Sequence, residues 1–128
     1  MEAPDTVDRS PLGIATAPAG SYSPDLLHRV SRKAKRDELG VSSPLPFTGC
    51  DIWTAYELSW LNPKGKPQVA MAEFRIPCDS PYLIESKSLK LYLNSFSMTP
   101  FPGDEAVREA LERDLSAAAG SKTAVSLM

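Results

Sequence analysis

The most regular stretch of this 128-residue sequence, residues 104 to 119, predicts an amphipathic helix. Its apolar side chains recur at helical spacing and share one face: Val107, Ala110, Leu111, Leu115 and Ala118. Asp104 and Glu105 stand where the positive end of the helix dipole falls, and Gly120 suits the turn that ends a helix. Because such a helix must bury its apolar face, the rest of the chain has to supply a surface for it.

Segments elsewhere in the chain predict the strands that can form this surface. Residues 51 to 61 (DIWTAYELSWL) are rich in the aromatic and aliphatic side chains of a core strand, and residues 68 to 76 alternate imperfectly between apolar and polar. Residues 62 to 67 (NPKGKP) combine two prolines with a glycine, a turn signal that predicts a hairpin. Alternation resumes at residues 122 to 128, which we expect to be a third strand that the chain leaves unfinished.

Two periods compete in residues 84 to 96 (IESKSLKLYLNSF). Three leucines alternate as they would on a strand: Leu89, Leu91 and Leu93. Another set has the spacing of a helix: Leu89, Tyr92, Leu93 and Phe96. We predict a helix, because Ser86 or Ser88 can cap its start and because the segment is longer than a typical strand.

The order of these elements is a hairpin, a short strand leading into a helix, a second helix and a new strand. This order is typical of an α+β fold in which helices cover one face of an antiparallel sheet. We place the domain at residues 47 to 128, truncated in its third strand. Residues 1 to 46 hold six of the twelve prolines and show no sustained period, so we predict an irregular amino-terminal arm. A basic run in the arm fits a solvated face better than a phosphate site: His28, Arg29, Arg32, Lys33, Lys35 and Arg36.

Composition narrows the classes of function. A net charge of -2 supplies no field that would attract nucleic acid, and no apolar run approaches the roughly 20 residues that cross a bilayer. The first residues also lack the order of a secretory signal, so we expect a cytoplasmic protein without a membrane or direct nucleic-acid partner. Cys50 and Cys78 fit no metal-ligand spacing and are expected to be reduced, structural thiols. We predict no metal site, and no hydrolytic triad around His28.

The residues that favour a chemistry lie where the short strand meets the helix. The carboxylate of Glu85 can accept two parallel hydrogen bonds from an N–H and amino pair, as on the edge of a guanine-like base. Free backbone amides at the helix start and the Lys87 ammonium can hold a phosphate of a nucleotide cofactor. Residue chemistry alone favours a plainer interpretation, in which serines cap the helix and Glu85 and Lys87 lie on the surface.

The string IESKSLKLYLNSF resembles the signature motif of the 7-cyano-7-deazaguanine reductases, with matches from Glu85 to Tyr92. DIWTAYELSWLNPKGKPQVA and EALERDLS resemble the amino-terminal half of the long, tandem-domain branch of that family, so the resemblance covers at least residues 46 to 128. It implies the tunnelling fold, in which antiparallel sheets from several domains close into a barrel and active sites form where domains meet. It also implies reduction of a nitrile to a primary amine by two NADPH, on the path to the tRNA base queuosine.

Matched position by position, the motif implies that Ile84, Glu85 and Ser86 contact the deazaguanine and that Ser86 and Lys87 contact NADPH. The family nucleophile is a cysteine, followed seven positions later by an aspartate that delivers protons. Here Leu61 or Asn62 stands where the cysteine would be, and Gln68 replaces the aspartate. We therefore expect no catalytic residue in this chain, no reductase activity from it alone, and both groups in a missing carboxy-terminal half.

The resemblance implies three partners: the 7-cyano-7-deazaguanine substrate, the carboxy-terminal half of the same protein, and further copies in a homodimer or higher oligomer. One alternative is a catalytically inactive tunnelling-fold module that binds a purine or pterin or scaffolds an oligomer. Another is a tunnelling-fold enzyme acting on pterins, against which the lack of a His and Cys metal set argues.

Overall fold

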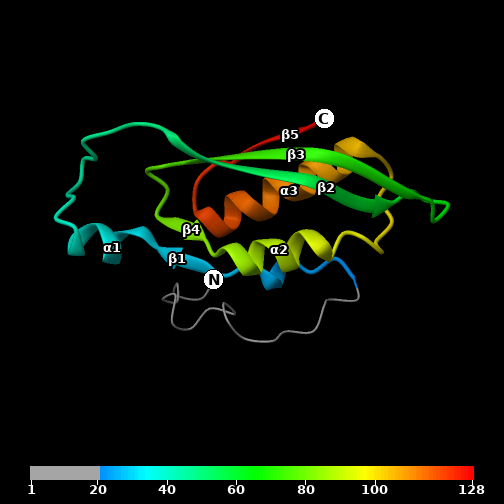
Figure 1. Ribbon diagram of the computed structural model, residues 1–128, viewed down its shortest axis with the longest axis horizontal. Helices are drawn as coiled ribbons and strands as arrows, with labels where there is room; N and C mark the ends of the chain where they lie inside the picture. Colours follow the sequence, from blue (N-terminus) through cyan, green and yellow to red (C-terminus); the bar gives the residue numbers. More distant parts are fainter. Residues whose placement is uncertain (1–20) are drawn as a thin grey trace.

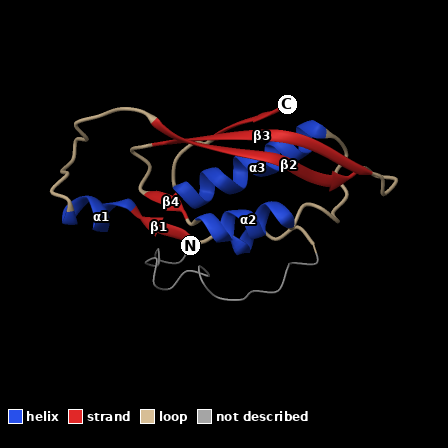
Figure 2. Cartoon of the chain, in the orientation of Figure 1, coloured by secondary structure: helices blue, strands red, loops and turns tan. Residues whose placement is uncertain are grey.

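The computed structural model describes residues 21 to 128, which form two antiparallel sheets and a set of helices. The larger sheet has the strand order β2 (Cys50–Leu61), β3 (Pro67–Pro77) and β5 (Ala124–Leu127). The smaller sheet pairs β1 (Arg29–Ser31) with β4 (Tyr82–Ile84). The helices are α1 (Arg32–Glu38), α2 (Ser86–Asn94) and α3 (Asp104–Ala119), and a short 3-10 helix, η2 (Pro24–Leu26), precedes β1. Helices α2 and α3 lie against one face of the larger sheet, as the α+β prediction required (Figures 1 and 2).

The predicted hairpin is confirmed as β2 and β3, which pair from Leu61 opposite Pro67 to Cys50 opposite Pro77. The register shifts between Ala55 and Leu58, where β2 has one residue more than β3 and forms a β-bulge. This bulge changes which residues of β2 face the helices. Trp53 and Ala55 pack against the core before it, and Leu58 and Trp60 are buried after it.

The hydrophobic core lies between the larger sheet and the helices. All five apolar residues predicted for the buried face of α3 are buried: Val107, Ala110, Leu111, Leu115 and Ala118. They meet Phe74 and Ile76 of β3 and Tyr92 and Phe96 of the α2 region in one cluster. Gly120 ends α3 with a φ of 73°, a left-handed conformation that favours glycine.

The predicted irregular arm is wrong for residues 24 to 38, which form η2, β1 and α1. Strand β1 runs antiparallel to β4, with Arg29 opposite Ile84 and Ser31 opposite Tyr82. A strand of three residues is too short to show a period in the sequence. It forms a strand because it pairs with β4, which lies far along the sequence. Residues 1 to 20 of the arm lie outside the described residues.

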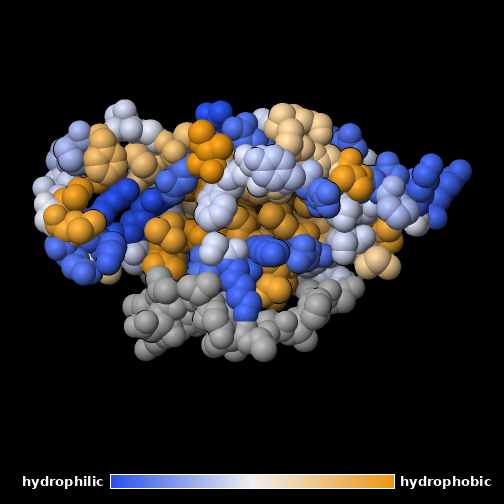
Figure 3. All heavy atoms as spheres, in the orientation of Figure 1, coloured by the Kyte–Doolittle hydropathy of each residue, from blue (hydrophilic) through white to orange (hydrophobic). Residues whose placement is uncertain are grey.

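Helices cover one face of the larger sheet and leave the other face exposed (Figure 1). Ile52, Tyr56 and Val69 lie on the face away from the helices and are 53%, 74% and 66% exposed. The hairpin turn projects beyond the sheet and presents a hydrophilic surface (Figures 1 and 3).

Among residues 21 to 128, no helix has the length and apolar character needed to cross a bilayer.

Candidate functional site

Helix α2 begins at Ser86, and Glu85 is the residue that caps it. Its carboxylate accepts hydrogen bonds from the backbone N–H of Lys87 at 2.7 Å and of Ser88 at 2.9 Å. The helix predicted for residues 84 to 96 is therefore confirmed, but the serine cap is wrong. A glutamate reaches two amides at once because each oxygen takes one, whereas the Ser88 hydroxyl donates back to the Glu85 carbonyl at 2.8 Å.

The Glu85 carboxylate retains capacity for a ligand while it caps the helix. A carboxylate offers about four acceptor positions, and the amides of Lys87 and Ser88 use two of them. The Ser86 hydroxyl lies 3.5 Å from the nearer oxygen, which is a long and weak contact. Glu85 is only 5% exposed, so an incoming donor would meet a carboxylate that water screens weakly.

The other residues implied by the motif differ in accessibility. The Ile84 side chain is 2% exposed and belongs to the hydrophobic core, so a ligand can meet this residue only at its backbone. Ser86 is exposed and lines a cavity of about 360 Å³ between α2 and β2. Lys87 is half-buried, and within residues 21 to 128 its ammonium forms no ion pair with a carboxylate. The structure thus brings Glu85, Ser86 and Lys87 together around one helix start.

The backbone of His28 forms two hydrogen bonds with this helix start, and nothing in the sequence indicated this contact. The backbone N–H of Glu85 donates to the His28 carbonyl at 2.9 Å. The backbone N–H of His28 in turn donates to the Ser88 hydroxyl at 2.9 Å. The main chain at position 28 therefore contacts both ends of the capping turn.

The positions at which the resemblance implied the nucleophile and acid of the family belong to the hairpin turn and the strand ends beside it. The Asn62 side-chain oxygen accepts the backbone N–H groups of Lys64 at 3.0 Å and Lys66 at 2.9 Å. Leu61 ends β2, and Gln68 donates its side-chain amide to the Pro67 carbonyl at 2.9 Å. This turn lies at the far end of the sheet from the junction of β4 and α2 (Figure 1).

The two cysteines lie at the opposite end of the hairpin from this turn. Cys50 begins β2 opposite Pro77, and the backbone N–H of Cys78 donates to the Gly49 carbonyl at 3.0 Å. Both are free thiols, one exposed and one half-buried. Among the residues that the structure describes, no three His, Cys, Asp or Glu side chains lie close enough to hold a metal ion.

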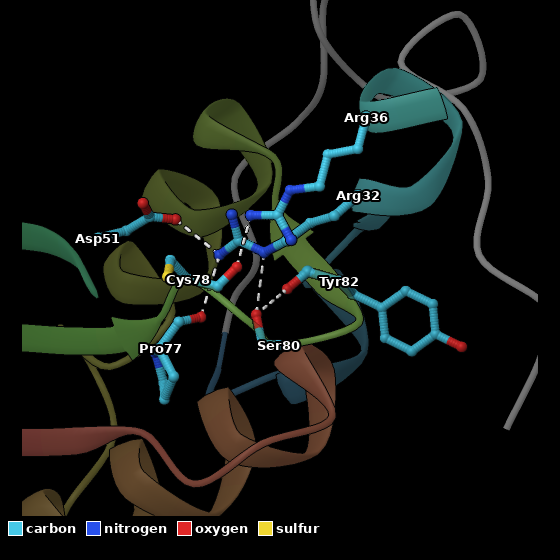
Figure 4. Close-up of polar contacts among 7 residues, drawn as sticks. All are labelled: Arg32, Arg36, Asp51, Pro77, Cys78, Ser80 and Tyr82. Atoms are coloured by element: carbon cyan, nitrogen blue, oxygen red, sulfur yellow. Dashed lines mark hydrogen bonds and ion pairs between the residues drawn. The ribbon is translucent and has the colours of Figure 1, made fainter. Parts of the chain in front are cut away.

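The basic run of the arm is partly structural, so its prediction as a solvated face is wrong for Arg32. This side chain is buried, and its guanidinium donates to Asp51 at 2.7 Å and to the Ser80 hydroxyl at 3.0 Å. Arg36 donates to the Cys78 carbonyl at 2.5 Å. Figure 4 shows both arginines extending from α1 onto the turn between β3 and β4.

A cavity of about 1050 Å³ adjoins these arginines, and its charges are largely matched. Lys33, which lines it, forms an exposed ion pair with Asp37 at 2.6 Å, and Arg32 is paired with Asp51. The remaining lining charges, Arg36 and Asp79, are of opposite sign. A phosphate would therefore find little uncompensated positive charge there.

Comparison with known proteins agrees with the motif. Residues 19 to 127 match the family model for the amino-terminal part of the nitrile reductase 7-cyano-7-deazaguanine reductase. The chain is 58% identical over 121 residues to the NADPH-dependent 7-cyano-7-deazaguanine reductase of Azoarcus sp. (strain BH72), covering 94% of this chain and 43% of that protein. Over 120 residues it is 53% identical to the protein of the same name from Burkholderia mallei (strain SAVP1), covering 94% and 44%.

The chain spans less than half the length of these curated relatives. The matched region includes both the capping turn at Glu85 and the hairpin turn at Asn62. The chain therefore belongs to the family of amino-terminal domains of the 7-cyano-7-deazaguanine nitrile reductases.

Proposed function

We propose that this chain is the substrate- and cofactor-binding domain of an NADPH-dependent reductase that converts 7-cyano-7-deazaguanine to 7-aminomethyl-7-deazaguanine in queuosine biosynthesis. The observation that carries the proposal is the Glu85 carboxylate, which is nearly buried, fixed by two amides and still able to accept hydrogen bonds. The names of the relatives support the reaction and the cofactor.

Glu85 would identify the base through its remaining acceptor positions. The ring N–H and exocyclic amino group of a deazaguanine present two parallel donors, which suit the two oxygens of one carboxylate. The exposed Ser86 hydroxyl can add a third contact, and Ile84 can contribute through its backbone.

Ser86 and Lys87 would bind NADPH at the same helix start. The backbone amides of Lys87 and Ser88 are taken by the Glu85 carboxylate, so the group that would hold a phosphate here is the Lys87 ammonium, with the exposed Ser86 hydroxyl beside it. NADPH supplies the hydride equivalents when it is bound. The two reductions of the nitrile each also need a proton, for which the Asn62 turn offers no acid.

The missing thiol and acid would come from the carboxy-terminal half, and a homodimer or higher oligomer would complete the site. In the described chain the hairpin turn between β2 and β3 lies far along the sheet from the junction of β4 and α2 (Figure 1), so a nucleophile placed at such a turn would have to reach this junction from another domain. Strand β2 is also an edge of the sheet among the described residues, and its outer backbone groups before Leu61 are left for a partner, since only Leu61 pairs with Thr99 and Phe101.

Calorimetric titration of the chain with 7-cyano-7-deazaguanine tests the proposal. We expect binding by the chain and a loss of at least about 100-fold in affinity for Glu85→Leu, because the buried donors of the base are left unpaired. Glu109→Leu, an exposed glutamate on α3, is the matched control and should bind as the parent does. Unchanged affinity of Glu85→Leu would contradict the assignment.

A turnover assay separates the proposal from its alternative, an inactive module that binds a purine or pterin or scaffolds an oligomer. We expect no NADPH oxidation by the chain alone, and oxidation when a carboxy-terminal half bearing the cysteine and aspartate is added. Equal affinity for guanine and for the nitrile base, with no turnover in the mixture, would favour the alternative.

A further inference from the structure

We propose that residues 22 to 31, called the strap, position the Glu85 carboxylate, and that Tyr22 and Asp114 are positioning residues at the far end of the strap. The meaning of Glu85 as a ligand-binding group rests on the proposed function. The mechanical link between the strap and the capping turn does not, and it can be measured without any ligand.

The strap runs along α2 from its carboxyl end toward its amino end. At the carboxyl end, the backbone N–H of Tyr22 donates to the Thr99 hydroxyl at 2.8 Å, and that of Ser23 donates to the Ser95 hydroxyl at 3.1 Å. Leu26 and Leu27 then pack against the hydrophobic core. The backbone and the side chains of the strap are thus both held along this helix.

The Asp114 carboxylate binds a tyrosine of the strap and a tyrosine of α2 at the same time. The hydroxyls of Tyr22 and Tyr92 both donate to the same oxygen of Asp114, the latter at 2.7 Å. Asp114 lies on α3 and is 9% exposed, and Tyr92 lies on α2 and is fully buried. The Tyr22 ring packs edge-on against Phe96, with ring centroids 5.1 Å apart. Asp114 therefore fixes the strap, α2 and α3 relative to one another.

The other end of the strap closes the capping turn itself. His28 accepts from the Glu85 N–H and donates to the Ser88 hydroxyl, which donates onward to the Glu85 carbonyl. From Arg29 the strap continues as β1, which pairs with β4. Any shift of the strap would leave these nearly buried groups without partners, which is costly enough to move the helix start with it.

The position of the helix start decides where the unused acceptor positions of Glu85 point. The carboxylate is held by the amides of Lys87 and Ser88, so it follows the first turn of α2. Binding of a base by two parallel hydrogen bonds is sensitive to displacements of this kind, since a misplacement of about 1 Å can cost roughly 100-fold in an enzyme reaction. The strap thus acts on the ligand through Glu85 and does not touch it.

Amide hydrogen exchange of Tyr22→Phe tests the link, because this variant keeps the ring and removes the hydroxyl. We expect exchange at the amides of Lys87, Ser88 and Leu89 to rise about tenfold, with exchange at Phe74 in β3 rising much less. Tyr56→Phe, at an exposed tyrosine, is the matched control and should change neither. Thr99→Val removes the hydroxyl that accepts the Tyr22 N–H and donates to the Ser95 carbonyl, and it gives a second variant if Tyr22→Phe folds poorly.

Equal acceleration at Phe74 and at the capping turn would mean that Tyr22 serves only global stability and would overturn the positioning role. Unchanged exchange at Lys87 and Ser88 in both variants would do the same. Affinity for 7-cyano-7-deazaguanine is the second measurement, and we expect it to fall about tenfold in Tyr22→Phe. If the parent chain binds no base, the proposed function fails, while the exchange data still decide the role of the strap.

Discussion

Asn62 in the hairpin turn and Glu85 at the start of α2 bind backbone N–H groups in the same way but differ in the acceptor positions that they have left. Each side chain accepts two backbone N–H groups, those of Lys64 and Lys66 for Asn62, and those of Lys87 and Ser88 for Glu85. Asn62 receives both on one amide oxygen, which has about two lone pairs, whereas Glu85 receives one on each of two oxygens. The amide oxygen is saturated and the carboxylate is not.

The difference separates the turn that we propose to bind the base from a turn whose polar side chain has no acceptor position left. Asn62 only shapes the backbone of its turn, on an exposed hairpin end where water can replace any lost partner. Glu85 shapes the backbone too, but in a nearly buried place where its spare acceptor positions remain available. The following predictions test this contrast.

The largest effect is expected from Glu85→Ala. It removes the cap and leaves the amides of Lys87 and Ser88 without acceptors, which should lower the free energy of unfolding by about 2 to 3 kcal/mol. Glu85→Gln keeps one acceptor oxygen and should lose less than half of that. Urea denaturation measures both, and equal losses in the two variants would show that the cap depends on charge and not on acceptor number.

Alkaline pH should lower the stability that comes from the contacts of Tyr22 and Tyr92 with Asp114. Burial, followed by the hydrogen bond to Asp114, raises the pKa of Tyr92 above its ordinary value near 10, and the pKa of Tyr22 is raised by the same causes. A raised pKa in the folded state means that stability is intact below about pH 10. Above that, the unfolded chain loses these protons first, so stability should fall by about 1.4 kcal/mol per pH unit for Tyr92.

Urea denaturation between about pH 9 and pH 12 measures this fall in stability. Tyr92→Phe should flatten the dependence, and Asn62→Ala should leave it as steep as in the parent chain. If Tyr92→Phe kept the full slope, the loss would have to come from groups other than Tyr92.

Asn62→Ala should destabilise the fold by about 1 kcal/mol, because the amides of Lys64 and Lys66 lose an acceptor but can turn to water. Affinity for 7-cyano-7-deazaguanine should not change. Urea denaturation and calorimetry measure the two quantities, and a drop in affinity would break the separation between a structural turn and a binding turn.

The smallest effect is expected from Ser86→Ala. The hydroxyl lies 3.5 Å from the Glu85 carboxylate, so its loss should change the free energy of unfolding by less than about 0.5 kcal/mol. A fall in base or NADPH affinity without a fall in stability would assign Ser86 to the ligand. A clear loss of stability would instead make Ser86 part of the cap.

Elements with a local period could be predicted from the sequence, and elements defined by distant partners could not. The faces of α2 and α3 followed from apolar spacing, and the hairpin followed from its turn residues. The bulge in β2 could not be predicted in this way, because Ile52 and Tyr56 are as apolar as the inward residues but lie on the exposed face. The strap had no local signal either, because β1 is ordered by β4 and Tyr22 by Asp114.

For the candidate site, the motif implied which residues contact the ligands but not how these residues are held. Sequence reasoning assigned the cap to serines, since short hydroxyl side chains are the commonest caps. It could not show that Glu85 caps the helix itself, that the Ile84 side chain is buried, or that Arg32 is used up by Asp51 and Ser80. Each of these depends on the relative placement of segments that local patterns do not describe.

The contact between Tyr22 and Asp114 also bears on the order in which the protein folds during synthesis. The two residues are 92 positions apart, so the ribosome releases Tyr22 long before it makes its partner. Contacts of such long range form late and at a high entropic cost. Under the proposed role of the strap, the junction of β4 and α2 reaches its final geometry only after α3 has emerged, and until then the Tyr22 hydroxyl lacks Asp114 as its acceptor.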